Sequence, residues 1–73
     1  MLINELGQLF WKLGVQAAKG GDAMYDYKKA IERNDGEDPI TDFSKKYLAE
    51  IFTNSELLLK QAKELWEKIC NGQ

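Results

Sequence analysis

The stretch LGQLFWKLGVQAAKGG, residues 6–21, carries Gly7, Gly14 and Gly21 inside a pattern that otherwise predicts an amphipathic helix. Glycine is the least helix-favouring ordinary residue, and each one costs a helix about 1 kcal/mol relative to alanine. Spaced by seven residues, the glycines share one side of the helix and allow another backbone to approach closely. The stretch therefore predicts a helix whose smooth side contacts a second helix, of this chain or of a partner.

A helix over residues 2–19 has a wider apolar surface than an ordinary surface helix. A leucine stripe lies beside Ile3, Phe10 and Ala17, and the glycines and Trp11 extend the apolar side further. This arc is about 200° wide at 100° per residue, whereas a surface helix needs an apolar stripe of about 100°. The sequence GGD at 20–22 then predicts the end of this helix, because glycine favours a left-handed C-cap and aspartate caps the next helix.

The rest of the chain predicts two or three further helices. One spans 23–33 and stops at the turn signal NDG, residues 34–36. Asp38 and Pro39 are typical of a helix start, which predicts a helix over 39–52. The capping-box sequence TNSE at 53–56 predicts a break and a last helix over 54–70. The apolar stripe keeps its phase across that break, however, so the alternative is one long helix over 39–70.

We therefore expect an all-α fold, a compact bundle of three or four helices that forms a single domain over residues 1–73. A chain of this length buries only about 60% of its unfolded surface, so its core is thin. The single cysteine, Cys70, excludes an internal disulfide, and the chain has no histidine, the commonest zinc ligand. Helix packing or self-association is left as the source of stability.

The net charge and the hydropathy of the chain argue against several classes of function. The net charge is −2, which does not attract nucleic acid or anionic membranes. The N-terminus lacks the basic region of a secretory signal, and the apolar runs are too short to span a bilayer. We expect a cytoplasmic protein without a membrane.

No pattern of residues predicts an enzyme. Cys70 has no base or orienting partner at the sequence level, and no pair of carboxylates is singled out for acid–base work. The acidic segment NDGEDPITD fails as a calcium loop, because aligning Gly36 with the required glycine places Ile31 and Pro39 at ligand positions. We expect no catalytic residues, no metal and no cofactor.

Basic residues occur as two doublets beside tyrosines. If the second and third helices lie side by side, these residues form a phosphate-binding patch that suits an anionic nucleotide. The residues of this possible anion site are Lys28, Lys29, Arg33, Lys45 and Lys46. An ordinary solvated surface is the simpler interpretation.

Two other binding modes are weakly supported. The sequence YLAEIFTNSELLLKQAKELW, residues 47–66, resembles the spacing of a helix-turn-helix, which makes a DNA-binding regulator an alternative. Its second helix presents Glu56 and Glu64, whose carboxylates repel phosphate, so the charge pattern argues against nucleic acid. Binding of the first helix to a membrane surface is disfavoured because that helix has few lysines.

Binding through helix packing remains the best-supported function. Aromatic residues anchor protein interfaces, and Phe10 and Trp11 lie beside the in-phase glycines. We predict a small, non-enzymatic, self-associating protein, such as a phage-type inhibitor or regulator, that acts stoichiometrically on a protein partner. The predicted partner-binding or oligomer-interface residues are Gly7, Phe10, Trp11, Gly14, Ala18 and Tyr25.

Overall fold

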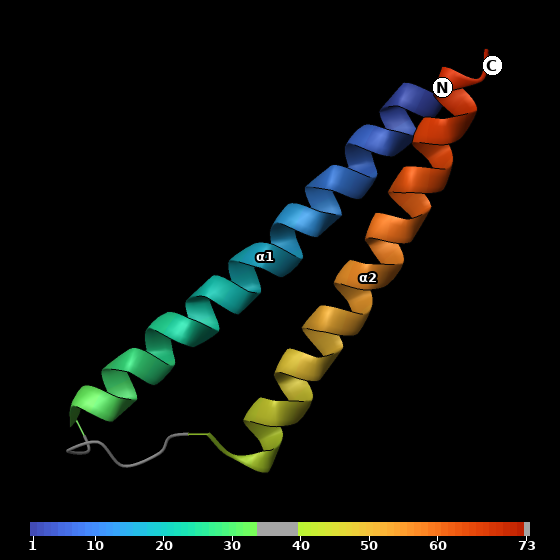
Figure 1. The fold of residues 1–73 in the computed structure, drawn as a ribbon. Helices are drawn as coiled ribbons and strands as arrows, with labels where there is room; N and C mark the ends of the chain where they lie inside the picture. Colours follow the sequence, from blue (N-terminus) through green and yellow to red (C-terminus); the bar gives the residue numbers. More distant parts are fainter. Residues whose placement is uncertain (34–39, 73) are drawn as a thin grey trace.

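Two long helices form the part of the chain that the structure, a computed structural model, describes: residues 1–33 and 40–72. Helix α1 spans Leu2–Arg33 and helix α2 spans Asp42–Cys70. They lie side by side and antiparallel, so that the start of α1 and the end of α2 meet at one end of the hairpin (Figure 1). The all-α prediction is confirmed, but the described residues contain two helices and not three or four.

The two helices contact each other along a seam with spacings that alternate between three and four residues. This is the heptad pattern of a coiled coil, in which two positions of every seven face the partner helix. All of the seam residues are buried or half-buried. The α1 members are Leu2, Leu6, Leu9, Leu13, Gln16, Gly20, Ala23, Tyr27 and Ala30, and the α2 members are Ser44, Leu48, Ile51, Ser55, Leu58, Ala62, Leu65 and Ile69.

Leucine and isoleucine fill the seam at the end where the termini lie, and smaller or polar residues occupy its middle. Among the described residues only Ala23, Ile51 and Ala62 are buried, and each keeps a few per cent of its surface exposed. Gln16 and Ser55 face each other across the seam and line one cavity. The thin core expected from the length of the chain is therefore thinnest halfway along the hairpin.

The predicted helix end at GGD is wrong, because α1 continues through Gly20, Gly21 and Asp22 to Arg33. The two glycines together cost the helix about 2 kcal/mol relative to alanine. A break there would interrupt the seam, in which Gly20 and Ala23 continue the spacing set by the leucines. The left-handed glycine lies elsewhere: Gly72, with φ 83°, follows the C-cap of α2.

The predicted break at TNSE is also wrong, and the alternative of one long helix is correct over residues 42–70. Ser55 lies in the seam between Ile51 and Leu58, so the apolar stripe passes through the polar segment without losing phase. The predicted start at residue 39 is wrong as well. Thr41 is the N-cap, and its hydroxyl oxygen accepts a 3.1 Å hydrogen bond from the backbone N–H of Ser44. The predicted turn and cap at residues 34–39 lie outside the described residues.

The hairpin is elongated, which corrects the expectation of a compact bundle. Its radius of gyration is 16.9 Å, and its extents are 57 × 17 × 13 Å. A compact domain of this length has a radius of gyration of about 11 Å. The accessible surface is 5849 Å², whereas a compact monomer of this mass exposes about 4,600 Å². Two helices alone therefore leave apolar side chains uncovered.

Candidate protein-interaction surface

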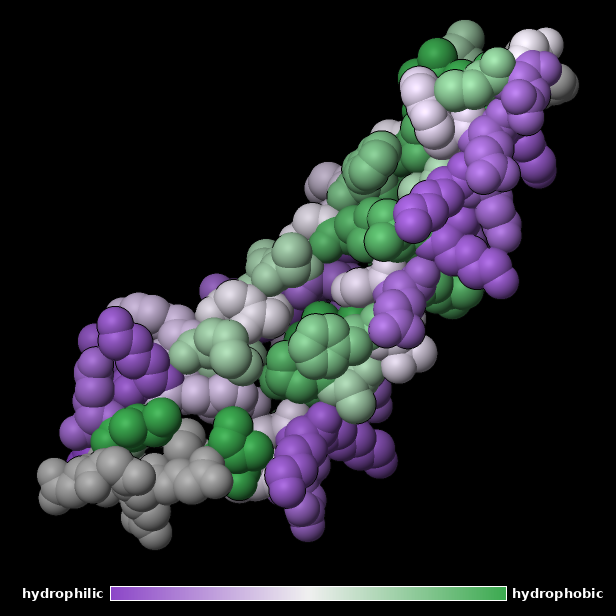
Figure 2. Space-filling view, viewed as in Figure 1, coloured by the Kyte–Doolittle hydropathy of each residue, from purple (hydrophilic) through white to green (hydrophobic). Residues whose placement is uncertain are grey.

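Both helices carry a second apolar column, displaced by one residue from the seam and turned to the same broad side of the hairpin. Figure 2 shows hydrophobic side chains along the length of this side, over both helices. We call this surface the open face. It consists of Ile3, Phe10, Ala17, Met24 and Ile31 on α1, and Phe52, Leu59 and Trp66 on α2, each seven residues from the next on its helix, and the charged Lys45 ends the α2 column.

The open face is exposed although it is apolar. Phe10 is 58% exposed, Phe52 63% and Trp66 56%. An exposed apolar surface that runs over two elements marks an interaction site more often than scattered single residues do. The open face is therefore the first candidate for an interface.

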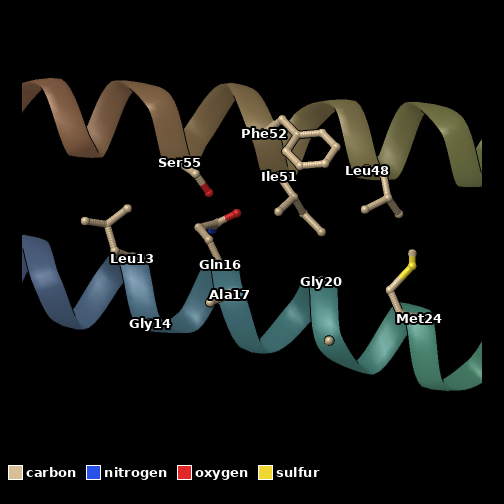
Figure 3. A pocket seen from close by; sticks show the side chains of 11 residues that line it. Leu13, Gly14, Gln16, Ala17, Gly20, Met24, Leu48, Ile51, Phe52 and Ser55 are labelled. Atoms are coloured by element: carbon tan, nitrogen blue, oxygen red, sulfur yellow. The ribbon is translucent and has the colours of Figure 1, made fainter.

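A groove of about 680 Å³ lies in the middle of the open face. Figure 3 shows Ile51, Phe52 and Leu48 of α2 above it, and the small residues of α1 below it. A separate cavity between Leu6, Phe10 and Trp66 lies nearer the termini. Bulky side chains thus dominate one part of the open face, and glycine and alanine hollow out the adjoining part.

Gly7, Gly14 and Gly21 form a glycine column beside the open face on α1. A Cβ atom added at any of the three meets no atom within 4 Å, apart from the helix's own neighbouring backbone. Packing inside the hairpin therefore does not require glycine at these positions. What the column does is leave the flank of α1 smooth next to Phe10.

The predicted interface residues divide into two groups. Gly7, Gly14 and Phe10 belong to the glycine column and the open face, whereas three others lie on the far side of the glycine column, where Trp11 also lines a cavity with Leu57 of α2. We call these three the outer row: Trp11, Ala18 and Tyr25. Trp11 is 71% exposed and Tyr25 60%, with the Lys29 ammonium 5.4 Å from the centre of the Tyr25 ring.

Sequence reasoning missed the contribution of α2. All of the predicted interface residues lie on α1, but Leu59 and Trp66 of α2 are exposed on the open face together with Phe52. The available signal was the seven-residue spacing of Phe52, Leu59 and Trp66, which matches that of Ile3, Phe10 and Ala17. That spacing is informative only once the helix is known to be continuous.

The opposite side of the hairpin is more polar. Lys12, Lys19 and Asp26 lie along α1 there, and Asn54 and Gln61 along α2. One aromatic pair interrupts it, Phe43 stacked on Tyr47 with ring centroids 6.4 Å apart. This side therefore lacks an apolar column like the one that runs along α1 from Ile3 to Ile31.

The five cations of the predicted anion site lie at the end of the hairpin where α1 finishes and α2 begins. Helical geometry turns them to different sides at 100° per residue. Lys45 faces the open face, where it lines a cavity with Met24 and Leu48, whereas Lys29 lies over Tyr25 on the outer side. The directions of Lys29 and Lys45 therefore give no support to a single phosphate-binding site, and the anion site stays a prediction.

Residues 47–66 contain no turn, because the whole segment lies inside α2. The helix-turn-helix arrangement considered for this segment is therefore not present. Among residues 1–33 and 40–72, neither helix combines the length and apolarity needed to cross a membrane.

No protein-family model, characterised protein or solved structure matches this chain.

Proposed function

We propose that this chain is a small, non-enzymatic helical binding protein, which self-associates and acts stoichiometrically by occupying a protein partner. The observation that carries the proposal is the quantity of aromatic and aliphatic surface that the hairpin leaves exposed on two sides of α1. Aromatic residues dominate the energetics of protein interfaces. The open face and the outer row each present such residues at regular spacing.

The two surfaces suit different tasks. The open face spans both helices and includes a groove, so it suits packing against further helices. The outer row is a narrow strip on one helix, with Trp11 and Tyr25 on either side of the small Ala18. A strip of this kind fits the groove of a protein partner, where an exposed helix is recognised through side chains on one side. We assign partner binding to the outer row.

The test is affinity capture from cells of the source organism, followed by measurement with the purified captured protein. Trp11→Ala with Tyr25→Ala is the test variant. Phe43→Ala is the matched control, because Phe43 is a 78% exposed aromatic side chain on α2, outside the outer row. We expect one protein to be captured by the wild type and the control at a fixed stoichiometry, and lost with the double variant. Equal capture by all three baits would contradict the assignment.

A further inference from the structure

We infer that the open face is the interface between two copies of this chain, which form an antiparallel four-helix bundle with the connections between α1 and α2 at opposite ends. This inference rests on the self-association in the proposed function and names its geometry. A two-fold axis perpendicular to the helices then packs α1 against α1 of the second copy and α2 against α2.

The exposed area matches what a dimer needs. A stable interface buries about 800 Å² on each partner. The accessible surface of 5849 Å² exceeds that of a compact monomer of the same mass by roughly 1,200 Å². The excess lies on an elongated hairpin whose open face is apolar along both helices. A second copy covers the part of that face that carries Phe10 and Ala17 on α1 and Phe52, Leu59 and Trp66 on α2.

The sequence pattern is that of a bundle and not of an isolated pair of helices. A two-stranded coiled coil needs apolar residues at only two positions of seven, whereas core-facing helices of a bundle add a third. Both helices add the third column here, as Phe10 and Met24 on α1 and Phe52 and Leu59 on α2. A lone hairpin gives these columns nothing to pack against.

The α1 pair explains the glycine column. In an antiparallel pair centred at Lys12, Phe10 of each copy lies opposite Gly14 of the other, and Ile3 lies opposite Gly21. Each large side chain thus faces a glycine. A Cβ atom at Gly14 or Gly21 meets nothing within the hairpin, so a second copy supplies the contact that the glycines accommodate.

The same axis aligns α2 with itself. Lys12 and Leu58 line one cavity, which places the middle of the α1 pair level with Leu58 and Leu59. The axis then brings Leu59 against Leu59 of the second copy and Phe52 against Trp66.

Charge agrees with this alignment. Glu56 of each copy lies beside Lys63 of the other, twice across the axis, at the rim of the interface. Lys28 and Lys45 interrupt the apolar surface at the end where α1 finishes, beyond the region that the second copy covers. In a bundle with both connections at the same end, α1 faces α2 of the other copy. Phe10 then no longer lies opposite Gly14 of the other copy, and Glu56 no longer lies beside its Lys63.

The first measurement is the molar mass in solution, by light scattering across a range of concentrations. We expect a dimer for the wild type, a monomer for Leu59→Lys and a dimer for Leu57→Lys. Leu57 is the matched control, since it is also exposed but lines a cavity on the other side with Trp11 and Asn54. A wild type that stays monomeric at millimolar concentration, or equal masses for the two variants, would overturn the inference.

The second measurement determines whether the two copies are antiparallel, and it does not depend on a variant that disrupts the dimer. Leu59→Cys with Cys70→Ser is expected to form an intermolecular disulfide on mild oxidation, because Leu59 lies on the axis, whereas Leu57→Cys with Cys70→Ser is not. Spin labels on Cys70, the single cysteine of the chain, are expected to be roughly 35 Å apart at 1.5 Å per residue. Labels closer than about 20 Å, or no disulfide through position 59, would overturn the antiparallel arrangement.

These outcomes are separate from those of the proposed function. A monomer that still captures a partner through Trp11 and Tyr25 would contradict the dimer alone. A dimer whose outer row captures no protein would contradict the partner assignment alone.

Discussion

At the scale of single residues, the glycines of α1 lie in different columns of the helix although they are the same type of residue. Gly20 lies in the seam, whereas Gly7 and Gly14 lie in the glycine column, and both Gly14 and Gly20 line the groove of the open face. All three have helical neighbours and open space where a Cβ atom would be. The effect of a substitution therefore depends on what approaches each position from outside the hairpin.

Replacing Gly20 with alanine is expected to stabilise the hairpin. The change removes a helix-propensity penalty of about 1 kcal/mol, and the new methyl group meets no atom within 4 Å. We expect the melting temperature to rise by about 4–8 °C, the shift typical of 1 kcal/mol in a domain of this size. Thermal unfolding followed by circular dichroism measures it, and a lower melting temperature would show that the groove has no room at Gly20.

Replacing Gly14 with leucine is expected to weaken association while leaving the helices intact. Leucine favours the helix more than glycine does, but its side chain occupies the space into which Phe10 of a second copy packs. We expect the dimer dissociation constant to rise at least tenfold, measured by analytical ultracentrifugation. Ala18→Leu, on the outer row, is the control and should leave the constant unchanged; a similar loss in both variants would contradict the role of the glycine column.

At the scale of the elements, packing along the seam decides whether each helix continues through a local break signal. Local signals at GGD and TNSE predict breaks, but Gly20 and Ser55 continue the seam spacing on either side. Poor helix formers cost up to about 1 kcal/mol each. A break would also turn the following leucines and alanines away from the other helix, and the loss of that packing exceeds the local penalty.

The seam depends most on its small buried members. Ala62 is 4% exposed, the most buried of the core residues. Ala62→Lys places a charge where α1 and α2 touch, which costs several kcal/mol unless the side chain escapes to water. We expect loss of most helical signal at room temperature.

Ala18→Lys is the matched control for this variant, since Ala18 is exposed on α1 and touches no part of the seam. Far-ultraviolet circular dichroism of the two proteins compares them directly. A folded Ala62→Lys protein with the stability of the control would contradict the position assigned to Ala62.

At the scale of the whole molecule, an elongated hairpin with only three buried residues among those described has little stability of its own. Association stabilises a folded chain by mass action, because the second copy binds the folded state and not the unfolded one. We therefore expect the melting temperature to rise with protein concentration over the micromolar to millimolar range. A melting temperature independent of concentration would indicate that folding and association are not coupled.

The charges at the rim of the interface provide a further prediction. Glu56→Lys places like charges together and is expected to weaken the dimer several-fold, since an exposed ion pair contributes about 0.2–1 kcal/mol. The double variant Glu56→Lys with Lys63→Glu restores opposite charges across the two-fold axis and is expected to recover the wild-type dissociation constant. A double variant weaker than either single variant would contradict the α2 pairing.

The sequence by itself determined the all-α class, the outer limits at Leu2, Arg33 and Cys70, and an excess of apolar surface around Phe10 and Trp11. These properties follow from local propensity and from the composition of each segment, which act over a few residues. Only the tertiary structure decided that GGD and TNSE lie inside helices and that Phe52, Leu59 and Trp66 join Phe10 on one face. The physical reason is that the free energy gained by a local helix break differs by only a few kcal/mol from the packing free energy that a continuous helix keeps. That packing free energy depends on which side of α1 contacts α2, which local sequence does not specify.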